Sequence, residues 1–372
     1  MKIRDIRTTA LKVALPRVFE GGTYRITHRA TIITEIVTEG GPSGRMYSGD
    51  TRSDDQGKVR AAIERELKPL LIGEELLAPE RLWEKMFQRA VAEPGRRNVL
   101  MEALSAVDIA VWDAIGKVAD LPVYRLWGGY RDTVPIIAIV GYYEEGKDLG
   151  ALRAEMAWLR EQGMAGVKMK VGRYSVDEDI ARLAACRQGG GSDFQIAADA
   201  NRAWDTRDAI RFAEASRAHD LLWLEEPIQW HNEIAGMRRV REVTGVPVCA
   251  GQSARAAAQV RDLVDGHAID WCNLDASYAG GPTEWRRAAA YAALHDVRMA
   301  HHEEPQVAMH LLASVPNGGY MECFPSPDRD PLWATLIANR PRIHDGLIDL
   351  PTGPGFGLEF DPEVIERYRV AD

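Results

Sequence analysis

The chain has 372 residues, of which 46% are apolar and 27% are charged, and its formal net charge is −9. This composition is typical of a folded water-soluble protein, and the length fits a barrel joined to a smaller domain better than one ordinary core. A negative balance without a basic block argues against a nucleic-acid partner, because phosphate binding needs a basic face.

The N-terminus and the cysteines both favour a cytoplasmic protein. Met1-Lys2-Ile3-Arg4-Asp5 does not resemble a signal peptide, and no apolar run approaches the length of a membrane span. The four cysteines are scattered without CxxC spacing, so we interpret them as buried, reduced thiols. We therefore expect no membrane partner.

Residues 1–125 are predicted to form an α+β capping domain. The segments 1–16 and 30–48 are predicted to be antiparallel strands, because residues 31–37 are rich in β-branched side chains and Glu39-Gly40-Gly41-Pro42 supplies a turn after them. Between residues 97 and 118, apolar side chains recur at helical spacing and predict one long amphipathic helix. Gly116 and Pro122 predict its end.

Residues 17–30 connect the two predicted strands and contain the glycine pair Gly21-Gly22. One interpretation is a lid over the active site, with the glycines as hinges and with Arg25 or His28 reaching a distal carboxylate of the substrate. The other interpretation is a long hairpin connection without a functional role. The sequence leaves both open.

Residues 126–335 are predicted to form a parallel barrel. Short apolar runs separated by amphipathic helical segments indicate this fold; they lie at 134–141, 166–171, 195–199, 221–225, 247–250, 269–274, 297–300 and 319–323. The fold class is thus α/β, with a modified (β/α)7β TIM-like barrel. Residues 336–372 are rich in glycine and proline, too irregular to extend a barrel, and are expected to pack back on the capping domain.

Polar side chains recur at the ends of these predicted strands. They are Lys168 and Lys170, Asp199 with Asn201 beyond it, Glu225, Gln252, Asp275, His302 and Glu322. Between positions 199, 225, 252, 275 and 302 the separations are 26, 27, 23 and 27 residues, one strand–helix unit each. In a barrel such residues converge at the C-terminal mouth, where active sites of this fold lie.

Two kinds of chemistry follow from this set. Asp199, Glu225 and Gln252 offer three oxygen ligands from adjacent strands, which suit a hard divalent cation such as Mg²⁺. Lys168 and Lys170 point to the same side of one strand, and their mutual repulsion is expected to lower a lysine pKa and so provide a general base. Taken singly, each residue fits a solvated strand face or a helix cap equally well.

The ordered set resembles the enolase superfamily in its mandelate racemase subgroup. The resemblance spans nearly the whole chain and rests on these motifs: Ser105-Ala106-Val107-Asp108-Ile109-Ala110-Val111-Trp112-Asp113, Lys168-Met169-Lys170, Asp199-Ala200-Asn201, Trp223-Leu224-Glu225-Glu226-Pro227, Asp275 with Ala279-Gly280-Gly281, His302 eight residues before His310-Leu311-Leu312, and Glu322. It implies a Mg²⁺-dependent enzyme that holds a substrate carboxylate while a base removes the α-proton, giving an enediolate. A lysine or histidine base that works beside Mg²⁺ is typical of this superfamily, and the resemblance implies the same pairing here.

The resemblance also implies roles for single residues. Lys170 would be the base on one face, with Lys168 lowering its pKa and touching the substrate carboxylate. Asp275 would orient His302, which works from the opposite face. Glu322, if protonated, would donate a hydrogen bond to the substrate carboxylate.

The remaining roles concern the metal and the substrate. Asp199 and Glu225 would be metal ligands, and Asn201 is assigned to substrate binding. Gln252 departs from the family, which usually has a carboxylate at that position. The site then carries one fewer negative charge, which suits a substrate with two carboxylates if Gln252 is a ligand, and leaves open that it is not one.

Retention of both Lys170 and His302 fits more than one reaction. The favoured interpretation is a lyase that dehydrates an acid sugar, an aldonate or aldarate, to a 2-keto-3-deoxy acid. The alternatives are a racemase, epimerase or cycloisomerase of a hydroxy acid, and a non-catalytic member that binds a sugar acid. The expected partners are a small carboxylate substrate and further copies of the chain in a homo-oligomer of two to eight subunits.

Overall fold

The apolar runs between Thr133 and Cys323 form a closed parallel barrel in the computed structural model, which describes residues 1–50 and 55–371. The barrel strands are β4 (Thr133–Val140), β5 (Gly166–Lys170), β6 (Gln195–Asp199), β7 (Trp223–Glu225), β8 (Val248–Ala250), β9 (Trp271–Cys272), β10 (Arg298–His301) and β11 (Gly318–Cys323). Each pairs in parallel with the next along the chain, and β11 pairs with β4 to close the ring. The predicted (β/α)7β barrel is confirmed.

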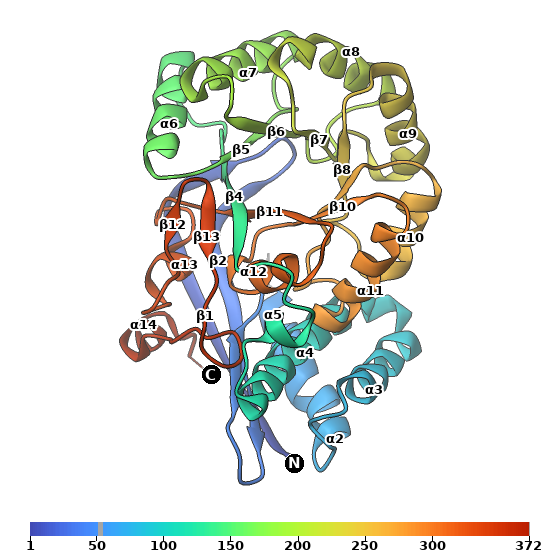
Figure 1. The fold of residues 1–372 in the computed structure, drawn as a ribbon, viewed down its shortest axis with the longest axis vertical. Coiled ribbons are helices and arrows are strands. Elements are labelled where there is room, and N and C mark those ends of the chain that lie inside the picture. The colour runs from blue at the N-terminus through green and yellow to red at the C-terminus, as the bar shows by residue number, and fades with distance from the viewer. Residues whose placement is uncertain (51–54, 372) are drawn as a thin grey trace.

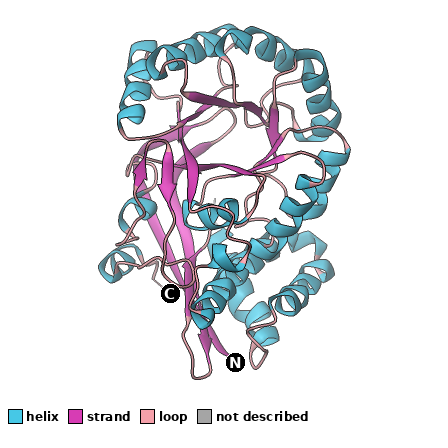
Figure 2. Ribbon diagram, viewed as in Figure 1, coloured by secondary structure: helices cyan, strands magenta, loops and turns pink. Residues whose placement is uncertain are grey.

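Helices that connect these strands surround the barrel (Figures 1 and 2). They are α6 (Leu149–Glu161), α7 (Val176–Gly190), α8 (Thr206–Ser216), α9 (Glu233–Thr244), α10 (Ala257–Asp265), α11 (Gly281–Ala293) and α12 (Pro305–Ser314), with short 3₁₀ turns η4 (Arg217–His219) and η5 (Trp230–Asn232). Several begin at side-chain caps: Ser175 and Glu178 form a capping box at α7, and Asp148 and Asp205 cap α6 and α8.

Strand β5, which carries the lysine pair, is a central barrel strand rather than a solvated edge. All five of its residues are buried, including Lys168 and Lys170. Its first residue must be glycine, since a β-carbon on Gly166 would lie 2.2 Å from the main-chain oxygen of Gln195 on the neighbouring strand. The interpretation of a solvent-facing lysine strand is therefore wrong.

The N-terminal domain combines a three-stranded antiparallel sheet with helices, at the lower end of the molecule in Figure 1. Its elements are β1 (Ile3–Glu20), β2 (Arg25–Thr38), β3 (Gly44–Tyr47), α1 (Gln56–Ala62), the π-helix η2 (Ile63–Leu67), α2 (Lys68–Leu71), α3 (Pro79–Ala92), η3 (Pro94–Arg96), α4 (Arg97–Ala119) and α5 (Val123–Leu126). Helix α4 confirms the predicted helix at 97–118. Within the described residues, no helix is both long and apolar enough to cross a membrane.

The segment 17–30, predicted as a loop, is mostly β-hairpin. Strands β1 and β2 continue through it to Glu20 and Arg25, and only the tip between them is a turn. The register shifts between Ala14 and Phe19, so an irregularity interrupts the ladder before the tip. The hairpin rises from the N-terminal domain to the barrel, as the blue strands of Figure 1 show.

The glycine pair lies at the hairpin tip and serves close approach rather than a hinge. A β-carbon on Gly22 would lie 2.7 Å from the main-chain oxygen of Val171 and 2.9 Å from that of Ala200. The neighbouring Thr23 hydroxyl donates to the main-chain oxygen of Asn201 at 3.0 Å. A side chain at position 22 would therefore push the tip away from the barrel mouth.

The C-terminal segment contacts both the capping domain and the barrel. It contains α13 (Pro331–Thr335), β12 (Ile343–His344), β13 (Leu347–Asp349) and α14 (Pro362–Tyr368). Near its end, the Val370 amide donates to the main-chain oxygen of Ala10 in β1. Strand β13 also pairs antiparallel with the start of β4, at Thr133–Pro135, but the barrel closes through β11 and β4 without it.

The Ser105–Asp113 motif lies in α4 and joins the parts of the chain. Asp108 accepts hydrogen bonds from the amide and hydroxyl of Thr283, at the start of α11, at 2.9 and 2.8 Å. Asp113 accepts from the amides of Arg45 and Phe356 at 2.7 and 2.9 Å. The two carboxylates thus hold α4 to the barrel, to β3 and to the C-terminal segment.

Candidate active site

Ionisable side chains from β5, β6, β7 and β11 meet in the barrel mouth, fully buried. The Lys168 ammonium lies 2.8 Å from Glu225 Oε1, 2.7 Å from Glu322 Oε1 and 3.7 Å from Asp199 Oδ2. Lys170 Nζ lies 2.6 Å from the same Asp199 oxygen. We name Lys168, Lys170, Asp199, Glu225 and Glu322 the lysine–carboxylate cluster.

The lysines in this cluster are held in the charged state by protein groups. Burial lowers the pKa of Lys170, but the Asp199 carboxylate together with the hydroxyls of Tyr24 and Tyr142 outweighs burial, so that the pKa lies above its ordinary value. Lys168 acts in the predicted direction and lowers the pKa of Lys170, although it does not outweigh Asp199. The expectation that the lysine pair alone yields a depressed pKa is therefore wrong.

The carboxylates respond in different ways to the same surroundings. Burial raises the pKa of Asp199, but Lys170 and Lys168 outweigh it and lower this pKa to about 2. Burial raises the pKa of Glu225 well above its ordinary value in spite of Lys168. Glu322 accepts from Lys168 and from the Glu303 amide, at 2.8 and 3.2 Å. The predicted role of Glu322 as a hydrogen-bond donor to the substrate carboxylate stays a prediction.

A divalent cation fits the donors at the ends of β6, β7 and β8. Asp199 and Glu225 are adjacent in register. The Gln252 amide nitrogen donates to Glu226 Oε2 at 2.8 Å, while its buried oxygen has no hydrogen-bond partner, and the Asn201 side-chain oxygen is likewise buried and unpartnered. No cluster of three or more His, Cys, Asp or Glu suited to a metal occurs in residues 1–50 and 55–371. The role of Gln252 as third ligand stays a prediction.

Asp275 and His302 form a buried pair beyond β9 and β10. Asp275 Oδ2 lies 2.9 Å from His302 Nδ1, and its other oxygen accepts from the amide and hydroxyl of Ser277 at 2.8 and 2.5 Å. Burial raises the pKa of Asp275, but its hydrogen bonds with His302 and the charge of the histidines lower it by more. His302 thereby keeps Nε2 for other chemistry. The neighbouring His301 accepts from the Ala276 amide at 3.1 Å, away from this pair.

Lys170 and His302, the two predicted acid–base groups, stand on strands that are not neighbours. In the order of the ring, three strand steps separate β5 from β10 through β4 and β11, and five separate them the other way. The strands bearing Asp199, Glu225 and Gln252 occupy the longer arc. Lys170 and His302 can therefore address a bound molecule from two sides.

The backbone at the mouth is strained at several non-glycine residues. Asn201 and Glu226, beyond β6 and β7, have φ values of 47° and 36°, and the successive residues Glu303 and Glu304 both have φ of 50°. Such left-handed conformations each cost on the order of 1–3 kcal/mol and cluster at functional sites. Here they turn the chain so that consecutive acidic side chains reach the barrel interior.

The two cations predicted to serve in a lid do not join the site. The Arg25 side chain is 67% exposed and pairs with Glu20 at 2.8 Å on the hairpin itself. His28 contacts the Thr27 hydroxyl at 3.3 Å on the exposed side of β2. Tyr24 is the tip residue over the site, since Lys170 Nζ lies 5.4 Å from its ring centroid.

Arg29, next to His28 in the chain, is a buried cation that the sequence reasoning missed. The Arg29 guanidinium is surrounded by Glu304 at 2.8 Å, Asp50 at 3.2 Å, Glu303 at 3.4 Å and Asp330 at 3.4 Å. We name these five residues the arginine cluster. Alternation along β2 places positions 28 and 29 on opposite faces, a signal that is usable only when this stretch is recognised as a strand.

Glu303 links the arginine cluster to the catalytic pair. Its Oε1 lies 3.4 Å from His302 Nε2 and 3.9 Å from Arg329 Nη2. Neither Glu303 nor Arg329 belongs to the series of strand-end residues that the sequence pointed out.

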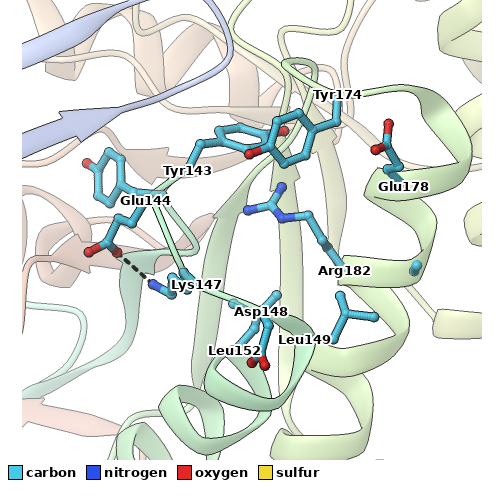
Figure 3. A pocket seen from close by; sticks show the side chains of 11 residues that line it. Tyr143, Glu144, Lys147, Asp148, Leu149, Leu152, Tyr174, Glu178 and Arg182 are labelled. Atoms are coloured by element: carbon cyan, nitrogen blue, oxygen red, sulfur yellow. Dashed lines mark hydrogen bonds and ion pairs between the residues drawn. The ribbon is translucent and has the colours of Figure 1, made fainter.

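Two cavities adjoin the site. One, of about 540 Å³, opens beside His302, Gln252 and Asn201, under Thr23 of the hairpin tip. The other, of about 310 Å³, lies between the end of β4, α6 and α7 (Figure 3). In Figure 3 the rings of Tyr143 and Tyr174 stand close together above Arg182.

The second cavity adjoins a scaffold for Lys170. Arg182 Nη1 donates to the main-chain oxygen of Lys170 at 2.8 Å, and Nη2 donates to that of Gly141 at 2.5 Å. Asp179 in turn accepts from Arg182 and from the Tyr143 hydroxyl, at 2.8 and 2.7 Å. Arg182 thus ties together the ends of β4 and β5.

A barrel with an N-terminal capping domain and ionisable side chains gathered at its mouth defines the class of the protein. Residues 5–128 match the mandelate racemase/muconate lactonizing enzyme N-terminal domain, and residues 151–364 match the enolase C-terminal domain-like family. The chain therefore belongs to the mandelate racemase/muconate lactonizing enzyme family of the enolase superfamily.

Its relatives include enzymes that act on sugar acids. It is 30% identical to 3,6-anhydro-alpha-L-galactonate cycloisomerase of Streptomyces coelicolor over 99% of both chains. It is 31% identical to arabinonate dehydratase of Saccharolobus solfataricus, over 91% of this chain and 90% of the relative. The crystal structure of a mandelate racemase/muconate lactonizing enzyme from a marine actinobacterium in complex with magnesium has a TM-score of 0.93 and 43% identity, covering 100% of this chain and 99% of that one.

Proposed function

We propose that the protein is a Mg²⁺-dependent acid sugar dehydratase. Asp199 and Glu225, with the side-chain oxygen of Gln252, would hold the cation, which supplies positive charge to the substrate carboxylate and so acidifies the α-carbon. The observation that carries the proposal is the placement of Lys170 and the Asp275–His302 pair on two sides of these ligands.

Lys170 takes the α-proton of the bound hydroxy acid, giving the enediolate. This step requires a neutral lysine, so Asp199 must be engaged as a metal ligand rather than as the partner of Lys170. Lys168, with its contacts to Glu225 and Glu322, stays charged and neutralises the carboxylate group of the substrate.

His302 then acts as the acid. Its Nε2 proton passes to the β-hydroxyl, which leaves as water while the enediolate electrons form the new double bond. The enol product becomes a 2-keto-3-deoxy acid. Asp275 fixes the ring through Nδ1 and stabilises the charged imidazolium before the transfer.

The test is a screen of acid sugars with the Mg²⁺-loaded protein. We expect a 2-keto product from at least one aldonate or aldarate, together with exchange of its α-proton in D₂O. If no acid sugar in the panel gives a product or exchanges its α-proton, the proposal is contradicted and a non-catalytic, sugar-acid-binding role is favoured.

Cycloisomerisation is the second candidate, and the relative that shares 99% of its length with this chain favours it. It uses the same proton abstraction but releases no water. Mass spectrometry separates the two outcomes, because a dehydration product is lighter than its substrate by one water and an isomer is not.

A further inference from the structure

Arg329, in the loop after β11, is a buried cation with unused hydrogen-bonding capacity. Its Nε donates to the Tyr142 hydroxyl at 3.2 Å, but Nη1 and Nη2 have no hydrogen-bond partner in the described part of the chain. The residue is only 2% exposed. A buried charged donor without an acceptor costs several kcal/mol, so this arrangement requires an acceptor that is part of the functioning protein.

The place of Arg329 in the ring is opposite the metal-binding oxygens. It follows β11, and Tyr142 follows β4, the two strands whose pairing closes the barrel. Strands β6 to β8 lie across the ring, with Lys170 and His302 on the strands between. Glu303 Oε1 lies 3.4 Å from His302 Nε2 and 3.9 Å from Arg329 Nη2. Arg329 therefore lies next to His302, on the other side of the Glu303 carboxylate.

The groups around Arg329 suit an anion. Burial raises the pKa of Tyr142, so its hydroxyl stays protonated. The hydroxyl oxygen accepts a hydrogen bond from Arg329, and its proton is left to donate to a ligand. The Phe324 ring lies 3.9 Å from the guanidinium carbon and excludes water from that face. The acidic residues nearby are held by Arg29, and Glu303 stands 3.9 Å from Arg329, beyond hydrogen-bond range. A guanidinium edge beside a hydroxyl donor matches a carboxylate.

We propose that Arg329 and Tyr142 bind the distal carboxylate of the substrate, and hence that the substrate is a dicarboxylic sugar acid rather than a monocarboxylic one. This inference rests on the proposed function, which fixes the first carboxylate at the metal. Gln252 supports it, because an amide in place of a carboxylate removes one negative charge from a site that must accept two. The role that the sequence suggested for Arg25 thus passes to a residue of the barrel.

The experiment compares aldarates with aldonates of the same length and configuration. For the Mg²⁺-loaded wild type we expect a higher kcat/KM with an aldarate. Arg329→Met should lower that value on the order of 100-fold, as expected for loss of a buried charge pair, and lower the aldonate value only a few-fold. Arg298→Met, which removes an exposed arginine at the start of β10, is the matched control and should change neither.

Equal losses for the two substrate classes, or a wild type that prefers aldonates, would overturn the inference. Arg329→Lys keeps the charge without the fork and serves if Arg329→Met does not fold. It should reduce the aldarate preference by an intermediate factor.

A binding measurement separates this inference from the proposed reaction. Isothermal titration of the Mg²⁺-loaded protein with glucarate and gluconate requires no turnover. Tighter binding of glucarate that is lost in the Arg329 variants supports the distal site even if no product forms. Equal affinity of wild type and variants for glucarate refutes it even if the protein proves to be a dehydratase.

Discussion

Two buried ionic clusters lie side by side in the barrel mouth, and they differ in how they are built. The lysine–carboxylate cluster is assembled from strand ends, with two ammonium groups among three carboxylates. The arginine cluster gathers four acidic side chains from three segments around one guanidinium. The first can exchange partners when a cation and a substrate enter. The second joins β2 of the capping domain to the barrel through a single residue, Arg29.

Removing the base tests the first cluster and should have the largest effect. Lys170→Met is expected to lower turnover by at least about 10³-fold and to abolish α-proton exchange in D₂O, since the group that takes the proton is gone. Exchange is followed by NMR with a substrate of the wild type. Exchange that survives in this variant would make His302 the α-proton base.

Removing the acid should separate the two steps. His302→Asn is expected to abolish product formation, because no group remains to protonate the leaving hydroxyl, while Lys170 still exchanges the α-proton. The same NMR assay reports exchange, and a keto-acid assay reports product. Undiminished product formation would exclude the histidine role.

The second cluster should respond in stability rather than in chemistry alone. Arg29→Met leaves four buried carboxylates without their cation and should lower the free energy of unfolding by about 3–5 kcal/mol, the usual cost of breaking a buried ion pair. Urea denaturation measures it. The matched control is Arg25→Met on the same strand, an exposed arginine whose loss should matter by less than about 0.5 kcal/mol. Similar values for both variants would mean that the arginine cluster is not a structural junction.

A buried carboxylate outside both clusters should give the most pH-dependent effect. Burial raises the pKa of Asp108 to about 7 in spite of its hydrogen bonds from Thr283. A raised folded-state pKa gives stability that is fully present below the ordinary value of 3.8 and is lost as pH rises through about 7. Urea titrations across this window should show that loss in wild type and a flatter profile in Asp108→Asn. Parallel profiles would contradict it.

The lysine–carboxylate cluster could be predicted from the sequence because its residues stand at regularly spaced strand ends, whereas those of the arginine cluster do not. The strand-end residues recur once per strand–helix unit, and the fold converts that spacing into proximity, so the spacing alone places Lys170, Asp199, Glu225 and His302 together. The protonation state of Lys170 could not be predicted in the same way, because it depends on the distance to Asp199 rather than on the lysine spacing.

The residues that sequence reasoning missed lie outside the repeating strand–helix units of the barrel. Arg29 comes from a hairpin strand and Arg329 from an irregular loop. Each forms a hydrogen bond with a partner far away in the chain, Arg29 with Glu304 and Arg329 with Tyr142, and no local sequence pattern indicates these contacts. Gly21 and Gly22 suggested flexibility by composition alone. The structure shows instead that Gly22 lies against the barrel and that Gly21 lies against the Tyr24 ring within the tip.

That contact at Gly22 has a kinetic consequence. The tip rests on the main-chain oxygens of Val171 and Ala200, with Tyr24 over the buried Lys170, so we expect a solute to reach Lys170 only after these contacts separate. Hairpin opening then sets an upper limit on turnover, and such motions take microseconds to milliseconds. Because the tip moves against solvent, the maximal rate should fall in viscous solution, and a deuterium isotope effect at the α-carbon should shrink as opening becomes the slow step.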